Sequence, residues 1–253
     1  MKRWPIYTLV GLLGYAVFTF AYFPAANLLS LAADRIPGGL RAAQIQGTLL
    51  GGSAKNLQLG HGTIQSLTWR WRPLALFTGR LAYALAVSEP GLDLRAVVSM
   101  DSAGDVRITG LQGQAALHRV ASLAGPYPLL LDGDLTLQIE ELRLDPTGIP
   151  NAAWGTLQLA QTRTSIGRVL ALGDFYATFT TADKTIRGEV KDTGGPLDLT
   201  GTLTHDPDGR YGFSGQLGVR DENNAELRQI LGILGQPGAD GKWPLEFTGS
   251  LGS

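Results

Sequence analysis

The sequence contains no cysteine, which excludes disulfide bonds, thiolate metal sites and cysteine nucleophiles. Charge is also sparse, since only 17% of the 253 residues are charged and the formal net charge is −1. No long stretch is strongly basic or acidic, so the chain does not attract a phosphate backbone and we expect no nucleic-acid partner. Hydrophobic residues make up 44% of the chain, an ordinary share for a folded protein, so we do not expect disorder.

Familiar catalytic and cofactor-binding motifs are missing as well. The sequence has no Gly-x-Ser-x-Gly elbow, no phosphate-binding loop and no dinucleotide fingerprint in a βαβ context. Its three histidines, His61, His118 and His205, stand in separate segments without a second ligand at metal-binding spacing, and we expect each on the surface or in a turn. These absences predict a protein that is not an enzyme and that binds no metal or cofactor.

Two acidic pairs could suggest chemistry, but each has a simpler interpretation. Asp132 and Asp134 flank a glycine, and Asp-Gly is typical of a turn. A hydrolase that uses this acidic pair is the alternative interpretation. Asp206 and Asp208 belong to HDPDG, which resembles the opening of a calcium loop. Because the downstream acidic ligand of that loop is missing, a turn is favoured here too.

One long apolar run lies near the N-terminus. Lys2 and Arg3 precede the segment from Ile6 to Phe23, which contains no charged residue. At about 1.5 Å per residue, 18 to 21 helical residues cover roughly 27–31 Å, the thickness of the bilayer hydrocarbon. A cleaved signal peptide has a shorter apolar core and a small-x-small site, so we expect a transmembrane anchor over residues 6–26. The basic residues should hold residues 1–5 in the cytoplasm and send the remainder to the far side.

Beyond a juxtamembrane helix or linker over residues 27–39, short runs of alternating apolar and polar residues recur with glycine between them. They form a first β segment, residues 40–125, and a second, residues 126–253, with a break from Ser122 to Pro128. This texture predicts a mainly β fold. We expect one long, curved, mostly antiparallel sheet, open or partly closed, or two such β segments.

The β texture has a few interruptions. Glu140 and Glu141 change the alternation and predict a solvated bulge at the edge of a sheet. A short helical patch covers QAALHRVASLAG, and a longer amphipathic helix is expected near 221–234, with Gly235 as its cap.

The clearest alternation is SLTWRWRPLALFTGRL, Ser66 to Leu81. Successive side chains on a strand point to opposite faces. Its inward set is Leu67, Trp69 and Trp71, and its outward set is Thr68, Arg70 and Arg72. Each indole can bury roughly 150–250 Å², which favours a core strand with a cationic outer face over an aromatic binding site. Pro73 lacks a backbone donor and should end the strand.

The run from Ile45 to Val87 resembles the signature of the type II secretion system protein N family. That signature has a glycine turn, an alternating strand, a proline element and a closing Gly-Arg-Leu. The corresponding residues here are Gly47, Thr48, Gly52, Trp69, Trp71, Arg72, Pro73, Leu74, Leu76, Gly79, Arg80 and Leu81. Leu50 stands where the family often has tryptophan.

The resemblance implies an accessory, non-enzymatic component of the secretion machinery. Such a protein would be a single-pass inner-membrane protein with its bulk in the periplasm, in contact with lipid through the N-terminal helix. Its partners would be other type II secretion proteins, reached through sheet edges or the face that carries Arg70 and Arg72. The layout is also similar to AsmA-like envelope proteins, which implies as an alternative a β-groove that binds or shuttles phospholipid.

Overall fold

The computed structural model describes residues 40–59, 62–124, 131–164, 169–221, 224–232 and 235–250. The expected cytoplasmic tip, anchor and linker, residues 1–39, lie outside these ranges, as does His61. Within the described ranges, no helix has the length and apolarity needed to cross a membrane.

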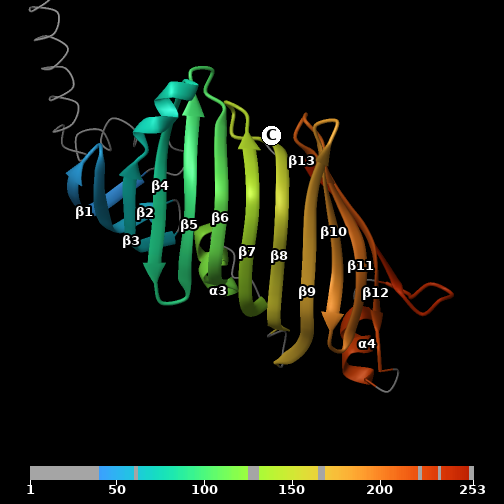
Figure 1. Ribbon diagram of the computed structural model, residues 1–253. Helices are drawn as coiled ribbons and strands as arrows, with labels where there is room; N and C mark the ends of the chain where they lie inside the picture. The colour runs from blue at the N-terminus through green and yellow to red at the C-terminus, as the bar shows by residue number, and fades with distance from the viewer. Residues whose placement is uncertain are drawn as a thin grey trace, which may run out of the picture.

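The described residues form a single 13-stranded sheet in which every strand pairs with its neighbours in chain order (Figure 1). All twelve pairings are antiparallel. The strands are β1 (Leu40–Thr48), β2 (Gly51–Leu59), β3 (Gly62–Trp71), β4 (Arg80–Glu89), β5 (Leu92–Asp101), β6 (Val106–Ala116), β7 (Leu131–Leu144), β8 (Pro150–Thr164), β9 (Leu170–Ala182), β10 (Thr185–Gly194), β11 (Leu197–His205), β12 (Arg210–Val219) and β13 (Trp243–Ser250). The short helices are η1 (Pro73–Thr78), α3 (Leu117–Ala124) and α4 (Ala225–Leu231).

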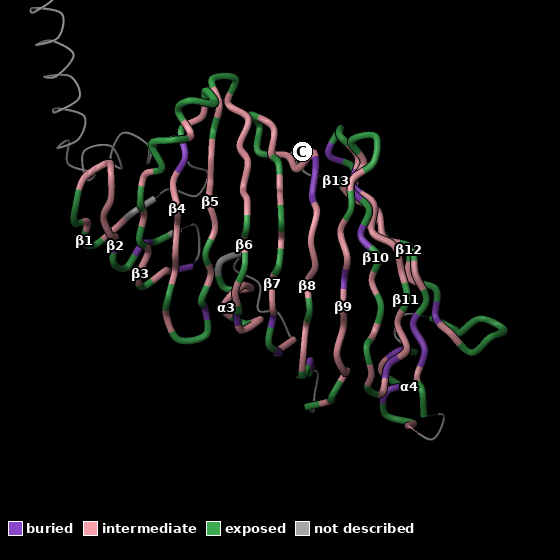
Figure 2. The backbone as a smooth tube through the Cα atoms, in the orientation of Figure 1, coloured by how far each residue is buried: buried purple, intermediate pink, exposed green. Residues whose placement is uncertain are grey.

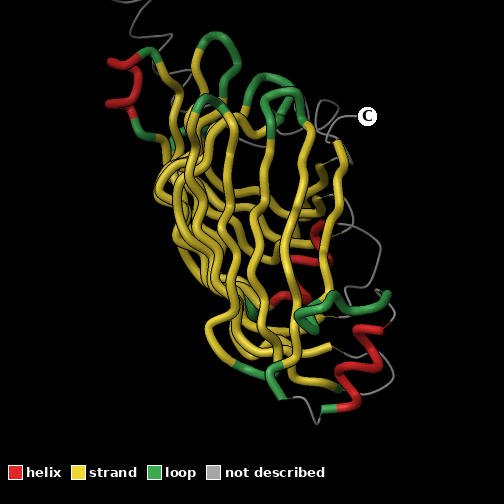
Figure 3. Tube along the Cα trace, turned by 90° about the vertical axis from the view of Figure 1, so that its right-hand side faces the viewer, coloured by secondary structure: helices red, strands yellow, loops and turns green. Residues whose placement is uncertain are grey.

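The sheet is strongly curved, and its two ends bend toward the side on which α3 and α4 lie (Figure 3). The short helix η1 lies toward the opposite side. Side chains of α3 and α4 pack on the sheet in two small buried clusters. One joins Leu92, Ala115 and Leu135 to Val120 of α3, and the other joins Leu227 and Leu231 of α4 to Leu197, Leu217 and Trp243. Most of the remaining strand residues are neither fully buried nor fully exposed (Figure 2).

The strand register separates two kinds of side chain. One row of cross-strand partners, here called the apolar row, contains only apolar residues or glycine on all thirteen strands. Its members are Ile45, Ala54, Leu67, Val87, Leu94, Gly113, Leu137, Leu157, Ala177, Val190, Gly201, Gly215 and Leu245. The adjacent row, here called the polar row, points to the other face and is polar or charged except at Ala86. Its members are Gln46, Ser53, Thr68, Ala86, Arg95, Gln112, Gln138, Thr156, Thr178, Glu189, Thr202, Ser214 and Glu246.

These rows define an apolar face, which carries α3 and α4, and a polar face. Side chains alternate between the faces because the strand period is two. At about 4.8 Å between strands, thirteen strands extend each row roughly 58 Å along the curve. An apolar face is normally covered by a second layer. Among the described elements, only α3 and α4 contribute buried clusters there, so much of this face has no covering layer.

The mainly β, antiparallel and open architecture with few short helices agrees with the expectation from sequence. The two expected β segments belong to one sheet, since β6 pairs directly with β7. The bulge is confirmed by a register shift between Ile139 and Glu141, but its expected place at a sheet edge is wrong because β7 is an interior strand. In α4, Leu227 and Leu231 are buried, and the cap at the helix end is Gly232 rather than Gly235.

Candidate interaction surface

Strand β3 sorts its side chains as the alternation predicts. Leu67, Trp69 and Trp71 are half-buried, whereas Thr68 and Arg70 are exposed on the polar face. The burial of the indoles is partial, and neither indole belongs to the buried clusters that α3 and α4 form with the sheet. The strand ends at Trp71, and Pro73 opens η1 as expected from its missing donor.

The ring of Trp69 is held by the turn that joins β1 to β2. Its Nε1 donates a hydrogen bond of 3.0 Å to the carbonyl of Thr48. A Cβ atom on Gly52 would lie 2.5 Å from Cζ2 of this ring and 2.3 Å from the carbonyl oxygen of Gln46, so only glycine fits there. At the same turn, the Leu50 amide donates to the Thr48 hydroxyl over 3.2 Å. Two turn residues of the family resemblance, Thr48 and Gly52, therefore lie against one indole.

The proline element folds into a compact corner between β3 and β4. The backbone amide of Arg72 donates to the carbonyl of Ala82 over 2.9 Å, and the Thr78 hydroxyl donates to the carbonyl of Ala75 over 2.8 Å. Gly79 ends η1 in the left-handed region at φ 71°, where glycine is favoured. Leu81, the last residue of the element, is 37% exposed.

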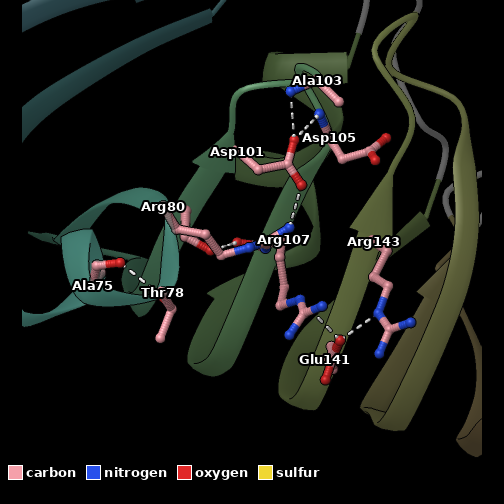
Figure 4. A network of polar contacts seen from close by, with 10 residues as sticks. Ala75, Thr78, Arg80, Asp101, Ala103, Asp105, Arg107, Glu141 and Arg143 are labelled. Carbon is pink, nitrogen blue, oxygen red and sulfur yellow. Dashed lines mark hydrogen bonds and ion pairs between the residues drawn. The ribbon is translucent and has the colours of Figure 1, made fainter.

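Arg80 begins a network of ion pairs on the polar face (Figure 4). Its Nη2 lies 2.6 Å from Oδ2 of Asp101, whose other oxygen accepts from the amides of Ala103 and Asp105. Burial alone would raise the pKa of Asp101, but the Arg80 side chain and these amides lower it overall. Arg80 and its partner thus tie the start of β4 to the end of β5.

Two further arginines continue this network on β6 and β7. Arg107 Nε and Arg143 Nε lie 3.2 Å and 2.5 Å from the same oxygen, Oε1 of Glu141 (Figure 4). The guanidinium of Arg143 also lies 5.4 Å from the ring centroid of Trp154. The bulge residue Glu141 is therefore a partner for two cations.

A second group of arginines is arranged differently. Arg70, Arg72 and Arg95 are exposed and line one hollow of the polar face, with a volume of about 840 Å³. Thr68 and Gln112 also line it, and its lining residues include no carboxylate. Among the described residues, none of these three arginines has an ion-pair partner. We name this site the arginine hollow.

The sequence predicts only part of the arginine hollow. The alternation on β3 indicates Arg70 and Arg72, but Arg95 comes from β5. Strand pairing places Arg95 beside the β3 arginines, because Thr68 pairs with Ala86 and Ala86 pairs with Arg95. Charge at matching positions of successive strands is the sequence signal, and it can be used only once the strand pairing is known.

The acidic pair of β7 does not form the expected turn. Asp132 and Asp134 lie within the strand on either side of a register shift, so the turn prediction is wrong. Oδ1 of Asp132 lies 3.5 Å from Nδ1 of His118, and its other oxygen accepts from Arg163 over 3.2 Å. The Gly133 amide, His118 and Arg163 lower the pKa of Asp132, so this carboxylate is a stable anion rather than a proton donor.

His205 also departs from expectation. It is the last residue of β11 and only 7% exposed, rather than at the surface or in a turn. The turn expected at HDPDG does form just beyond it, because the Asp206 amide donates to the Arg210 carbonyl and the Gly209 amide to the Asp206 carbonyl. Within the described residues, no group of three histidine or acidic side chains could hold a metal ion.

Comparison with known proteins gives a consistent result. The family model described as "Type II secretion system (T2SS), protein N" matches residues 38–246. The chain is 27% identical over 256 residues to a "Type II secretion system protein N" of Aeromonas hydrophila, covering 99% of this chain and 100% of that protein. It is 25% identical over 252 residues to the protein of that name from Pectobacterium carotovorum subsp. carotovorum, covering 94% of each.

A third relative of the same name, from Vibrio cholerae serotype O1, is 25% identical over 223 residues, covering 85% of this chain and 87% of the relative. No solved structure matches. The matched range of the family model includes the arginine hollow, η1 and nearly the whole sheet.

Proposed function

Because this chain belongs to the type II secretion system protein N family, we propose that it is an accessory, non-enzymatic component of the type II secretion machinery. In this proposal the segment from Ile6 to Phe23 anchors it in the inner membrane and the curved sheet faces the periplasm. The sheet acts as an interaction surface for other secretion proteins. The observation that carries the proposal is the family match along nearly the whole described sheet.

The arginine hollow supports an acidic partner segment. Guanidinium groups pair with carboxylates through two parallel hydrogen bonds, which gives both strength and orientation. Arg80, Arg107 and Arg143 are already engaged by Asp101 and Glu141, whereas the hollow brings together three arginines and no carboxylate. We therefore expect the contact with a secretion protein to form at Arg70, Arg72 and Arg95.

Crosslinking in intact cells tests this function. A photo-crosslinking residue at Arg70 or Arg72 should capture a secretion component. The matched control is Gln158, which is also exposed on the polar face but lies on β8, away from the hollow. Capture of lipid alone at Arg70, which lies farther from η1 than Arg72, or equal capture of secretion proteins at Gln158, would count against the proposal.

A second function, a groove that binds phospholipid, is favoured by one specific observation. The apolar row crosses all thirteen strands on the side toward which the sheet bends, and among the described elements only α3 and α4 form buried clusters on this face. Acyl chains would remove such a surface from water at roughly 25 cal/mol per Å². Native mass spectrometry of the gently extracted full chain should then detect retained phospholipid.

Substitutions at two neighbouring positions of β8 test which face of the sheet binds the phospholipid detected by mass spectrometry. Leu157→Gln places a polar group in the apolar row and should reduce the retained phospholipid, whereas Thr156→Gln alters the polar row and should not. If neither the unmodified chain nor the Thr156→Gln variant retains phospholipid, the groove function is ruled out and the scaffold function is untouched.

A further inference from the structure

The helix η1 exposes three large apolar side chains at one corner of the sheet. Leu74 is 76% exposed, Leu76 is 52% exposed and Phe77 is 88% exposed. None of the six residues of η1 is buried. We name Leu74, Leu76 and Phe77 the η1 tip. Figure 3 shows η1 standing out from the body of the sheet, on the side away from α3 and α4.

The exposure of the tip is built into the backbone. Pro73 starts η1, and the Gly79 amide donates to the carbonyl of Leu76 over 3.0 Å at its end. The Thr78 hydroxyl bonds within the same turn, and the amide of Trp71 donates to Leu50 O over 2.8 Å just before it. A turn held at both ends presents its side chains in a fixed direction, at a lower entropic cost of binding than a loose loop.

Arginines lie at the base of the tip. Arg80 and Arg107 are paired with Asp101 and Glu141, whereas Arg70 and Arg72 have no ion-pair partner among the described residues. A hollow at the base of η1 is lined by Arg70, Arg72, Arg80 and Arg107 together with Leu74. Its lining residues include no carboxylate. Arg72 immediately precedes η1, is exposed, and pairs with no carboxylate of the described chain. Apolar side chains at a protruding corner with cations behind them match the cross-section of a membrane interface, where acyl chains lie beneath anionic headgroups.

We propose that the η1 tip docks on an anionic membrane surface, with Leu74, Leu76 and Phe77 at the acyl boundary and Arg72 at the headgroup phosphates. A convex knob fits a deformable bilayer, whereas a protein partner would need a matching apolar pocket rimmed by acidic groups. This inference goes beyond the secretion function, because the contact requires only lipid. It would fix the orientation of the sheet relative to the bilayer.

The absence of cysteine permits a direct test on the full chain. Phe77→Cys carries a polarity-sensitive dye, and the protein is reconstituted into vesicles of phosphatidylcholine mixed with phosphatidylglycerol. We expect blue-shifted emission and quenching by a spin-labelled lipid. The control, Pro90→Cys, is exposed in the β4–β5 turn at the other end of β4 and should stay water-exposed. Arg72→Gln should lower the ratio of docked to undocked protein about fivefold, because one surface cation is lost.

Three outcomes would overturn the proposal. The dye at position 77 could be as water-exposed as the dye at position 90. It could remain quenched when Leu74→Ser and Leu76→Ser are combined, which would mean that the dye alone inserts. It could also be shielded in cells yet water-exposed in vesicles, which would assign the tip to a protein partner. Circular dichroism of each variant excludes loss of the sheet as the cause.

Discussion

At adjacent register positions on thirteen strands, the apolar row carries only hydrocarbon side chains or glycine, and the polar row carries amides, hydroxyls and charges except at Ala86. Both rows run across the same antiparallel strands. The buried clusters under α3 and α4 lie on the apolar face alone, whereas the ion pairs of Arg80, Arg107 and Arg143 lie on the polar face. We therefore expect the apolar face to determine stability and the polar face to determine recognition.

This division follows from magnitudes. Burial of a leucine or phenylalanine side chain contributes about 1.5–3 kcal/mol, whereas a solvent-exposed ion pair contributes about 0–1 kcal/mol. Changes on the apolar face should therefore alter the free energy of unfolding, and matched changes on the polar face should leave it nearly constant. The first three predictions compare one position on each face, and the last compares two positions on the polar face. All are measured on full-length protein in detergent, by urea unfolding followed through tryptophan fluorescence.

The largest difference is expected between Gly113 and Gln112. Gly113 has φ 147°, and a Cβ atom there would lie 1.9 Å from the carbonyl oxygen of Asp93. Gly113→Ala must push β5 and β6 apart, and we expect a loss on the order of 3–4 kcal/mol or failure to fold. Gln112→Ala, on the exposed side, should stay within about 0.5 kcal/mol of the original. Equal stability of the two variants would contradict the register.

A smaller difference is expected where α3 covers the sheet. Leu135 is 7% exposed and packs in the cluster of Leu92 and Ala115, so Leu135→Ala should cost about 2–4 kcal/mol. Its neighbour Thr136 points to the polar face, and Thr136→Ala should cost less than about 1 kcal/mol. If Thr136→Ala costs as much as Leu135→Ala, the stability does not reside mainly in the apolar face.

The comparison on β3 separates stability from recognition. Trp69→Phe keeps a ring but removes the hydrogen bond to the Thr48 carbonyl, which should cost about 1 kcal/mol. Arg70→Gln should leave the unfolding free energy within about 0.5 kcal/mol and weaken capture of the acidic partner in cells. An Arg70→Gln variant that is less stable than Trp69→Phe would reverse the assignment of the two faces.

The features that could be predicted from sequence are those that depend on local period. Trp69 and Arg70 alternate over a few residues, Pro73 removes a donor at a known position, and the extra residue near Glu140 shifts the alternation within one strand. The stripe of Leu227 and Leu231 predicted α4 for the same reason.

The features that could not be predicted depend on pairing between distant segments. Arg95 joins the arginine hollow only through two successive strand registers. His118 meets Asp132 because α3 returns over the start of β7, and His205 is buried although its own segment ends in a turn. The expected boundary near Ser122 reflected a real interruption of the alternation, yet β6 and β7 pair across it. The local sequence pattern does not predict which distant segments pair.

The smallest expected effect concerns the ion pairs of the polar face and depends on pH. Arg80 and the amides of Ala103 and Asp105 lower the pKa of Asp101 below its usual value. A lowered folded-state pKa stabilises the fold above the unfolded pKa of about 4, and this contribution is lost as the pH falls through the folded value. Asp101→Asn should therefore be slightly less stable than the original at pH near 7, and the difference should shrink below pH about 4.

Gln112→Ala is the control for this pH dependence. The stability difference for Gln112→Ala should stay constant across the same pH range, because neither side chain titrates. A difference for Asp101→Asn that persists unchanged in acid would show that the negative charge of Asp101 is not its source. The ion pair between Arg80 and Asp101 would then contribute little to the stability of the fold.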